Sequence, residues 1–251
     1  MDVKTTNKIC IPLTEYITGD HTENNIQVKT RITTTEGAFG EIWQACESIR
    51  NRGLECKYIL KYQPFRDADE AKGLPAITRD SIIKEATLQN EISKFGLAPP
   101  IKDSWICKTG GVIVMPSLKM TVYALFKIYD SIDIHYLILA RCLSLIKRLH
   151  EVGYYHGDSS ISNIMVDYSA SDLRDASEED TDISRYKTTN YRYYFIDMGF
   201  SERLKSPPDP EMIERDYQIF AISLQEKYDL GKNDNKNFGP LIEFMSEFLK
   251  K

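Results

Sequence analysis

The stretches YYHGDSSISN at residues 154–163 and FIDMGF at residues 195–200 decide how this chain is interpreted. The first places Asp158 and Asn163 on one short loop, and the second places Asp197 directly after a strand-like apolar run. An aspartate beside an acceptor hydroxyl, with an asparagine and an aspartate as oxygen ligands for a divalent cation, is the minimum set for phosphoryl transfer from ATP. Aspartate and asparagine also favour turns on their own. Here, however, both follow a long predicted helix, and the predicted strand that ends just before Asp197 comes after them. The combination predicts a phosphate-transfer site.

Size and composition limit the classes of protein to which the chain can belong. It has 251 residues and a formal net charge of −5, so it can bury the core of one catalytic unit or of two small lobes. The mild acidity argues against nucleic acid as the primary ligand, and no apolar run is long enough to span a bilayer. The N-terminus lacks the apolar stretch of a signal peptide. The scattered cysteines, odd in number and without C-x-x-C spacing, predict reduced thiols in an intracellular, cytoplasmic protein; they are Cys10, Cys46, Cys56, Cys107 and Cys142.

The first half of the chain has the pattern of a small β-rich unit. Residues 78–95 carry apolar side chains at helical spacing, and Gly96 predicts where that helix ends. A strand is expected after the glycine-containing turn EGAFG. Further strands are predicted at 26–35, 55–62, 101–107 and 111–115. We therefore expect five strands and one helix.

The second half predicts mainly helices. Residues 131–152 have the widest apolar helical face, and the helix is expected to end just before the loop that carries Asp158. Between two short predicted strands, residues 169–190 are acidic and polar, which predicts an exposed insertion. The short strands are 164–166 and 193–196, and the remaining predicted helices are 119–128, 211–228 and 239–250.

The spacing H-G-D-x-x-x-x-N, followed by I-D-M-G, resembles the catalytic and metal-binding motifs of the protein-kinase superfamily. The resemblance runs from Gly37 to Gly199 and implies an α+β, bilobal fold that binds ATP and Mg²⁺ between its lobes. A small antiparallel β-rich lobe with one helix, αC in the family, would occupy residues 1–115. A hinge at 116–118 would lead to a shortened, mainly helical lobe at 119–251.

The resemblance also implies roles for the residues of the two motifs. Asp158 would orient the attacking hydroxyl and accept its proton, while Asn163 and Asp197 would bind Mg²⁺. His156 would have a structural role and support the backbone of the loop. Asp216 would either anchor the same backbone from a later helix or be an exposed carboxylate.

The glycine-containing turn T-E-G-A-F-G-E-I would hold the phosphates of the nucleotide through its backbone N–H groups. Thr35 stands where the family has its first glycine, and such turns are also common in ordinary hairpins. The turn residues assigned to the nucleotide are Gly37, Ala38, Phe39 and Gly40.

Four further positions complete the expected nucleotide site. Lys61, in Y-I-L-K, resembles the lysine that contacts the α- and β-phosphates; the alternative is a strand-end lysine in water. Glu85 is the favoured ion-pair partner of this lysine, with Glu91 of the same helix as the alternative. Met115 would be the gatekeeper beside the adenine, and Leu118 would donate a backbone hydrogen bond because the intervening proline lacks an N–H.

Two departures from the family pattern narrow the expectation. Ser160 stands two residues after Asp158, where protein kinases that act on serine or threonine carry lysine, and no A-P-E segment follows Asp197. The H-G-D form is similar to the atypical RIO kinases and the kinase/ATPase of the KEOPS complex, and the short helical lobe without an A-P-E segment resembles a minimal viral kinase. We therefore expect a compact serine/threonine protein kinase with a protein substrate. The alternatives are a small-molecule kinase of the aminoglycoside or choline type, and an ATPase or pseudokinase subunit of a larger assembly.

Overall fold

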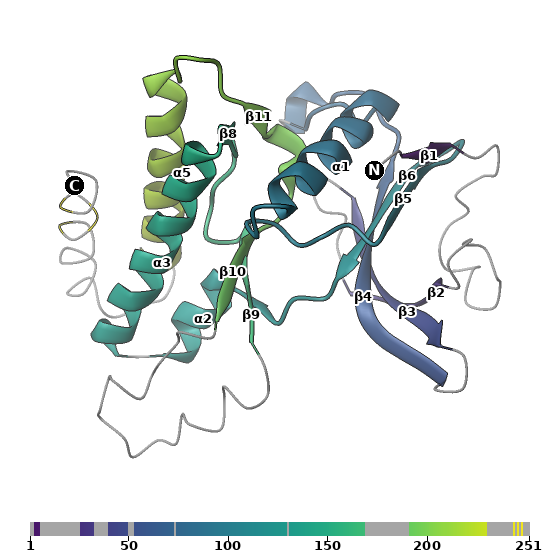
Figure 1. Cartoon of the computed structure of the whole chain (residues 1–251), viewed down its shortest axis with the longest axis horizontal. Helices are drawn as coiled ribbons and strands as arrows, with labels where there is room; N and C mark the ends of the chain where they lie inside the picture. The colour runs from purple at the N-terminus through teal and green to yellow at the C-terminus, as the bar shows by residue number, and fades with distance from the viewer. Residues whose placement is uncertain are drawn as a thin grey trace. The chain divides into compact units, whose positions relative to one another are not determined.

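The computed structural model of the chain has a mixed α+β architecture (Figure 1). It describes residues 3–5, 26–32, 40–49, 53–72, 74–129, 131–168 and 191–229, and the single positions 243, 245 and 247. The chain divides into two compact units, an N-terminal unit of Met1–Lys94 with Pro99–Ser117 and a C-terminal unit of Phe95–Ala98 with Leu118–Lys251. The division after Ser117 falls within the expected hinge at 116–118. The grouping of Phe95–Ala98 with the C-terminal unit differs from the expected boundaries.

The N-terminal unit is built on one six-stranded sheet in the order β1-β5-β6-β4-β3-β2. Neighbouring strands are antiparallel, except that β1 and β5 run parallel. The predicted strands are all present, and β1 is an addition that the sequence did not indicate. The strands are β1 (Lys4–Thr5), β2 (Ile26–Arg31), β3 (Glu41–Ile49), β4 (Gly53–Pro64), β5 (Asp103–Ile106) and β6 (Gly110–Pro116).

The two sides of β4 have different surroundings, because successive side chains of a strand point to opposite faces of the sheet. Tyr58 and Leu60 join a buried cluster that also contains Trp43 of β3. Ile59 packs on a separate cluster. Lys61 follows two residues later on the same side of the strand as Ile59, so this charged residue is directed away from the aromatic cluster.

The helix α1 (Arg79–Ser93) packs against β6 and corresponds to the helix predicted at 78–95. Its first turn is closed by a capping box, in which the Ser81 N–H donates to Thr78 Oγ1 at 3.1 Å and the Thr78 N–H donates to Ser81 Oγ at 2.9 Å. Ala86, one turn further on, packs against Met115 of β6. A short 3-10 helix, η2 (Glu70–Lys72), lies between β4 and α1 in the chain.

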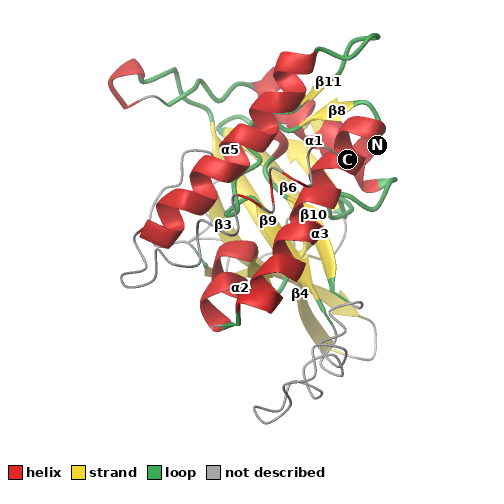
Figure 2. Cartoon of the chain, turned by 90° about the vertical axis from the view of Figure 1, so that its left-hand side faces the viewer, coloured by secondary structure: helices red, strands yellow, loops and turns green. Residues whose placement is uncertain are grey.

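The C-terminal unit combines long helices with two small antiparallel sheets (Figure 2). Helix α3 matches the helix predicted at 131–152 and lies side by side with α5 (Figures 1 and 2). None of the helices in the described part of the chain combines the length and the apolar content needed to cross a bilayer. The predicted insertion at 169–190 and most of the predicted helix at 239–250 lie outside the described residues. The elements are β7 (Met120–Thr121), α2 (Val122–Ile128), α3 (Ile132–Glu151), β8 (Tyr154–Tyr155), β9 (Ile164–Asp167), β10 (Arg192–Phe195), η4 (Met198–Phe200), β11 (Glu202–Arg203) and α5 (Pro210–Asp229).

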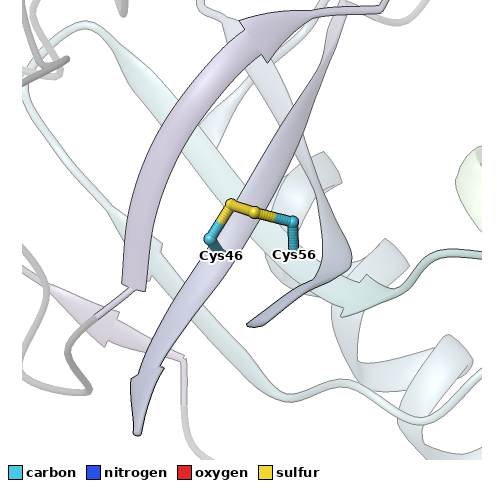
Figure 3. The surroundings of a disulfide bond; sticks show 2 residues. All are labelled: Cys46 and Cys56. Atoms are coloured by element: carbon cyan, nitrogen blue, oxygen red, sulfur yellow. A yellow bond between two sulfur atoms is a disulfide. The ribbon is translucent and has the colours of Figure 1, made fainter. Parts of the chain in front are cut away.

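A disulfide joins Cys46 of β3 to Cys56 of β4 (Figure 3). The expectation of reduced thiols is therefore wrong for these two residues, and Cys107 is disulfide-bonded as well. Cys142 is a free, buried thiol. The pairing of β3 with β4 shifts register between Ala45 and Glu47, which is where Cys46 lies, so the two sulfur atoms meet across neighbouring strands without any C-x-x-C spacing.

Candidate active site

A buried ion pair joins β4 to α1 within the N-terminal unit. Lys61 Nζ donates to Glu85 Oε1 at 2.8 Å, and Gln63 Nε2 donates to Glu85 Oε2 at 2.9 Å. The three residues are 5%, 3% and 2% exposed for Lys61, Gln63 and Glu85. The predicted pairing of Lys61 with Glu85 rather than with Glu91 is confirmed, while its role on a nucleotide stays a prediction.

The local sequence explains why these groups meet. Lys61 and Gln63 are two residues apart on a strand, so their side chains lie on one face of the sheet, the face toward α1. Glu85 lies one helical turn after Ser81 of the capping box, on the buried side of α1. Gln63 was missed from the sequence, although its i+2 position relative to Lys61 was the signal that could have indicated it.

The loop between β8 and β9 brings Asp158 and Asn163 together as predicted. Asn163 Nδ2 donates to Asp158 Oδ2 at 2.8 Å and to the Asp158 backbone oxygen at 3.0 Å. The Asn163 N–H donates to the Ser160 carbonyl at 2.9 Å, which tightens the same turn. Because the amide nitrogen is committed to Asp158, the amide oxygen Oδ1 is the atom of Asn163 that could bind a cation.

Of the two alternatives left open for Asp216, the structure shows the one in which it anchors the backbone of this loop. Asp216 Oδ2 accepts the His156 N–H at 2.9 Å, and Oδ1 accepts the Gly157 N–H at 2.9 Å. His150 Nε2 lies 2.9 Å from Asp216 Oδ2, and Ser159 Oγ donates to the Asp216 carbonyl. A fully buried carboxylate requires several such donors, so α5 and the loop hold one another in place. His150 and Ser159 were not identified from the sequence.

His156 connects the loop to the segment that carries Asp197. The Asp158 N–H donates to His156 Nδ1 at 3.2 Å, so the proton of the ring lies on Nε2, which is 3.1 Å from the Ile196 carbonyl. Burial lowers the pKa of His156 and keeps the ring neutral. The ring also packs against Phe195 with centroids 4.7 Å apart. These contacts agree with the structural role expected for His156.

Asp197 stands at the junction of β10 and η4 in a left-handed backbone conformation, with φ 62° and ψ 70°. This conformation costs an L-residue other than glycine about 1 kcal/mol or more, and such costs gather at functional sites. The Ile196 N–H donates to the Asn163 carbonyl at 2.9 Å, so the segment is tied directly to the loop. Asp197 therefore lies beside Asn163, as the two motifs predicted.

The electrostatic surroundings of Asp158 favour a proton acceptor. Burial raises the pKa of Asp158 above its ordinary value, and the negative charges of Asp197 and Asp216 act in the same direction. The hydrogen bond from Asn163 and the proximity of His156 oppose this shift. A carboxylate whose pKa is raised while it is held by an amide is a better base than a solvated one.

Asn163 and Asp197 form an oxygen donor set that suits Mg²⁺. The described residues contain no group of three or more His, Cys, Asp and Glu side chains that could enclose a metal ion. Mg²⁺ does not need such a cage, because it keeps several waters and binds through one or two protein oxygens and substrate phosphates. The Asn163 amide oxygen and the Asp197 carboxylate fit that requirement, and their role as ligands stays a prediction.

Of the four turn residues assigned to the nucleotide, the structure describes Gly40. Gly37, Ala38 and Phe39 lie outside the described residues. Gly40 has φ 120°, and a Cβ there would lie 2.1 Å from the Tyr62 carbonyl oxygen, so close strand packing already requires glycine at this position. A contact of Gly40 with phosphate stays a prediction.

The two residues expected beside the adenine are placed at the end of β6 and just after it. Met115 is buried, and its Sδ lies 3.5 Å from Gln89 Nε2 of α1. Leu118 is half-buried and is the first residue of the second segment of the C-terminal unit. Their contacts with adenine stay predictions.

No family model matches the chain, and no curated protein matches it.

Proposed function

We propose that this chain is a phosphotransferase of the protein-kinase kind, which transfers the γ-phosphate of Mg-ATP to a serine or threonine hydroxyl of a protein. The observation that carries the proposal is the loop in which Asn163 holds Asp158 while Asp216 holds the loop backbone. Asn163 of the same loop and Asp216 of the distant helix α5 are thereby used to fix one carboxylate and the backbone that carries it. Such fixing is required of a group that must align an acceptor hydroxyl.

Asp158 would accept the hydroxyl proton of the acceptor. Its backbone N–H and side chain are both hydrogen-bonded, to His156 and Asn163 respectively, so the carboxylate has little freedom to turn away. The raised pKa of Asp158 brings its proton affinity closer to that of the group it must deprotonate.

Mg²⁺ would be held by the Asn163 amide oxygen and the Asp197 carboxylate. When bound, the ion would neutralise negative charge on the phosphates. In support, the Ile196 N–H donates to the Asn163 carbonyl, so Asp197 directly follows a contact between its own segment and the loop.

Lys61 would bind phosphate oxygens of ATP, with Glu85 keeping the ammonium in place. A lysine that is 5% exposed requires anionic partners, and Glu85 supplies one of them. We extend the proposal to the fold: a kinase-like bilobal chain with a shortened helical lobe. Since no A-P-E segment follows Asp197, phosphorylation of an activation loop would not control it.

A small-molecule hydroxyl is the second candidate acceptor. The observation in its favour is Ser160, which replaces the lysine that protein kinases acting on serine or threonine carry near the catalytic aspartate. The same loop chemistry would serve either acceptor, since both present a hydroxyl to Asp158.

The proposal is tested by binding and by transfer. At a hundred times its dissociation constant, Mg-ATP should stabilise the protein by about 2.7 kcal/mol, which raises the melting temperature of a chain of this size by about 5–10 °C. Asp197→Ala should lose this magnesium-dependent shift. Labelled phosphate should then appear on proteins rather than on aminoglycosides or choline. Labelling of the small molecules alone would favour the second candidate acceptor. A protein that shows neither a melting-temperature shift with Mg-ATP nor phosphate transfer would reject both candidates.

A further inference from the structure

The Glu85 carboxylate is held at both of its oxygens by one strand. Lys61 occupies Oε1, and Gln63 occupies Oε2 from the next position on the same face of β4. The nitrogen of the Gln63 amide must face Glu85, because a carboxylate only accepts hydrogen bonds. Two donors on two different oxygens define the plane of the carboxylate, which one donor on one oxygen does not.

Helix α1 makes a further hydrogen bond to its unit one turn after Glu85. Gln89, four residues after Glu85 and therefore on the same side of α1, donates through Nε2 to the Pro99 carbonyl at 3.1 Å. Its Nε2 also lies 3.5 Å from Met115 Sδ. Both contacts lie within the N-terminal unit. The helix is thus attached to its own unit at Glu85 and again one turn later at Gln89.

Gln63 is an unusual residue for this position if packing alone is considered. It is 3% exposed, and within the part of the chain that the structure describes its Oε1 has no hydrogen-bond partner. A buried, unsatisfied carbonyl oxygen disfavours folding. The amide nitrogen therefore has a use at Glu85 that offsets the unsatisfied oxygen.

We propose that Gln63 is a positioning residue, which holds Glu85 against Lys61 so that the ion pair is already assembled in the resting protein. The inference rests on the function proposed above and deepens it, because it concerns how that site is regulated. In this chain the glutamate-bearing helix needs neither a modification nor a partner to bring Glu85 to the lysine.

Gln63→Met tests the role directly, because methionine has a similar size and no donor. We expect kcat/KM for ATP to fall about tenfold, the effect of losing one hydrogen bond to a charged group, while KM for the acceptor stays unchanged. The matched control is Gln218→Met. Gln218 donates to Glu214 at 3.0 Å on the exposed face of α5, so the same glutamine-to-glutamate bond is lost with no effect on kinetics.

Gln63→Glu provides a second variant with a signature that a merely structural role would not give. At acid pH the two facing carboxyl groups share a proton, and the resulting O–H restores a donor to Glu85. At alkaline pH both groups are charged and repel each other. The ratio of wild-type to variant kcat/KM for ATP should therefore grow between pH 6 and pH 9 for Gln63→Glu. The same ratio should stay level for Gln63→Met.

A measurement without nucleotide separates this inference from the proposed function. Acetylation of Lys61 by an amine-reactive acetyl ester, read by mass spectrometry against the exposed Lys147, should rise at least threefold in Gln63→Met and stay unchanged in Gln218→Met. If the wild type transfers phosphate but Gln63→Met matches it in kinetics and in Lys61 labelling, Gln63 is not a positioning residue. If the wild type transfers no phosphate, the proposed function fails, and an unchanged ratio of Lys61 to Lys147 labelling would overturn the positioning role on its own.

Discussion

Separating Lys61 from Glu85 should be among the most destabilising changes available in the N-terminal unit. Their side chains are 6% and 2% exposed, and Nζ lies 2.8 Å from Oε1. Removing one partner of a buried pair leaves a buried charge without its counter-ion and costs about 3–5 kcal/mol. For a chain of this size each kcal/mol lowers the melting temperature by about 2–4 °C, so Lys61→Met or Glu85→Leu should lower it by roughly 6–20 °C.

The double variant Lys61→Met/Glu85→Leu should be more stable than either single variant. Two apolar side chains of similar volume avoid the free-energy cost of removing two charges from water, and replacing a buried ion pair in this way is often neutral or stabilising. Urea unfolding of the wild type, both single variants and the double variant gives the coupling energy, provided that the denaturant slope is the same for all four.

An exposed pair on the same strand serves as the control. Lys57 Nζ lies 2.7 Å from Glu55 Oε2, as close as the buried pair, but the two side chains are 51% and 38% exposed. Lys57→Met should change the free energy of unfolding by less than about 1 kcal/mol, because solvent screens surface pairs. If the single variants at Lys61 and Glu85 behave like Lys57→Met and their effects simply add, the buried pair does not exist as described.

Three other predictions concern the loop and the disulfide. Asp216→Ala should lower the free energy of unfolding by about 2–4 kcal/mol in urea titrations, because two backbone N–H groups lose their acceptor, and an effect below about 1 kcal/mol would contradict the anchoring role. The pKa of Asp158 in the folded protein is raised above 3.8, so the stability that this carboxyl group contributes is present at low pH and is lost as pH rises through the folded pKa. Asp158→Asn should therefore have a higher melting temperature than the wild type at neutral pH, and the difference should close toward pH 4. A lower melting temperature of the variant at neutral pH would refute this. Cys56→Ser should lower the free energy of unfolding by about 2–3 kcal/mol, the loop-closure entropy of a disulfide loop of this length. Alkylation of the wild type without reductant should leave Cys46 and Cys56 unmodified, as read by mass spectrometry.

The sequence predicted those features that depend on short-range patterns. Alternation and helical spacing were sufficient to place β4 and α1, and the resemblance to the kinase motifs, with the distance of Glu85 from Gly96, favoured Glu85 over Glu91. The contacts of Asp158 with Asn163 followed from their shared loop. Features that depend on two strands meeting in a particular register could not be derived in the same way.

The disulfide and the second donor to Glu85 illustrate this limit. Cys46 and Cys56 meet because β3 and β4 pair with a register shift, and nothing in the spacing of the cysteines encodes that shift. Gln63 resembles any polar residue in a strand until its neighbour on the helix is known. The segment Phe95–Ala98 belongs to the C-terminal unit, and one of its contacts there is the Phe195 N–H, which donates to the Leu97 carbonyl at 2.8 Å from nearly a hundred positions later in the chain.

Transfer of γ-labelled phosphate from Mg-ATP to a panel of protein substrates, run for the wild type beside Asp158→Asn, tests the central claim most directly. We expect labelled phosphoserine or phosphothreonine with the wild type, and transfer reduced by at least a hundredfold with the variant, while the Mg-ATP melting shift of the two proteins stays the same. Equal transfer by both proteins would remove Asp158 from the mechanism. A wild type that binds Mg-ATP without labelling any hydroxyl would contradict the proposed phosphotransferase.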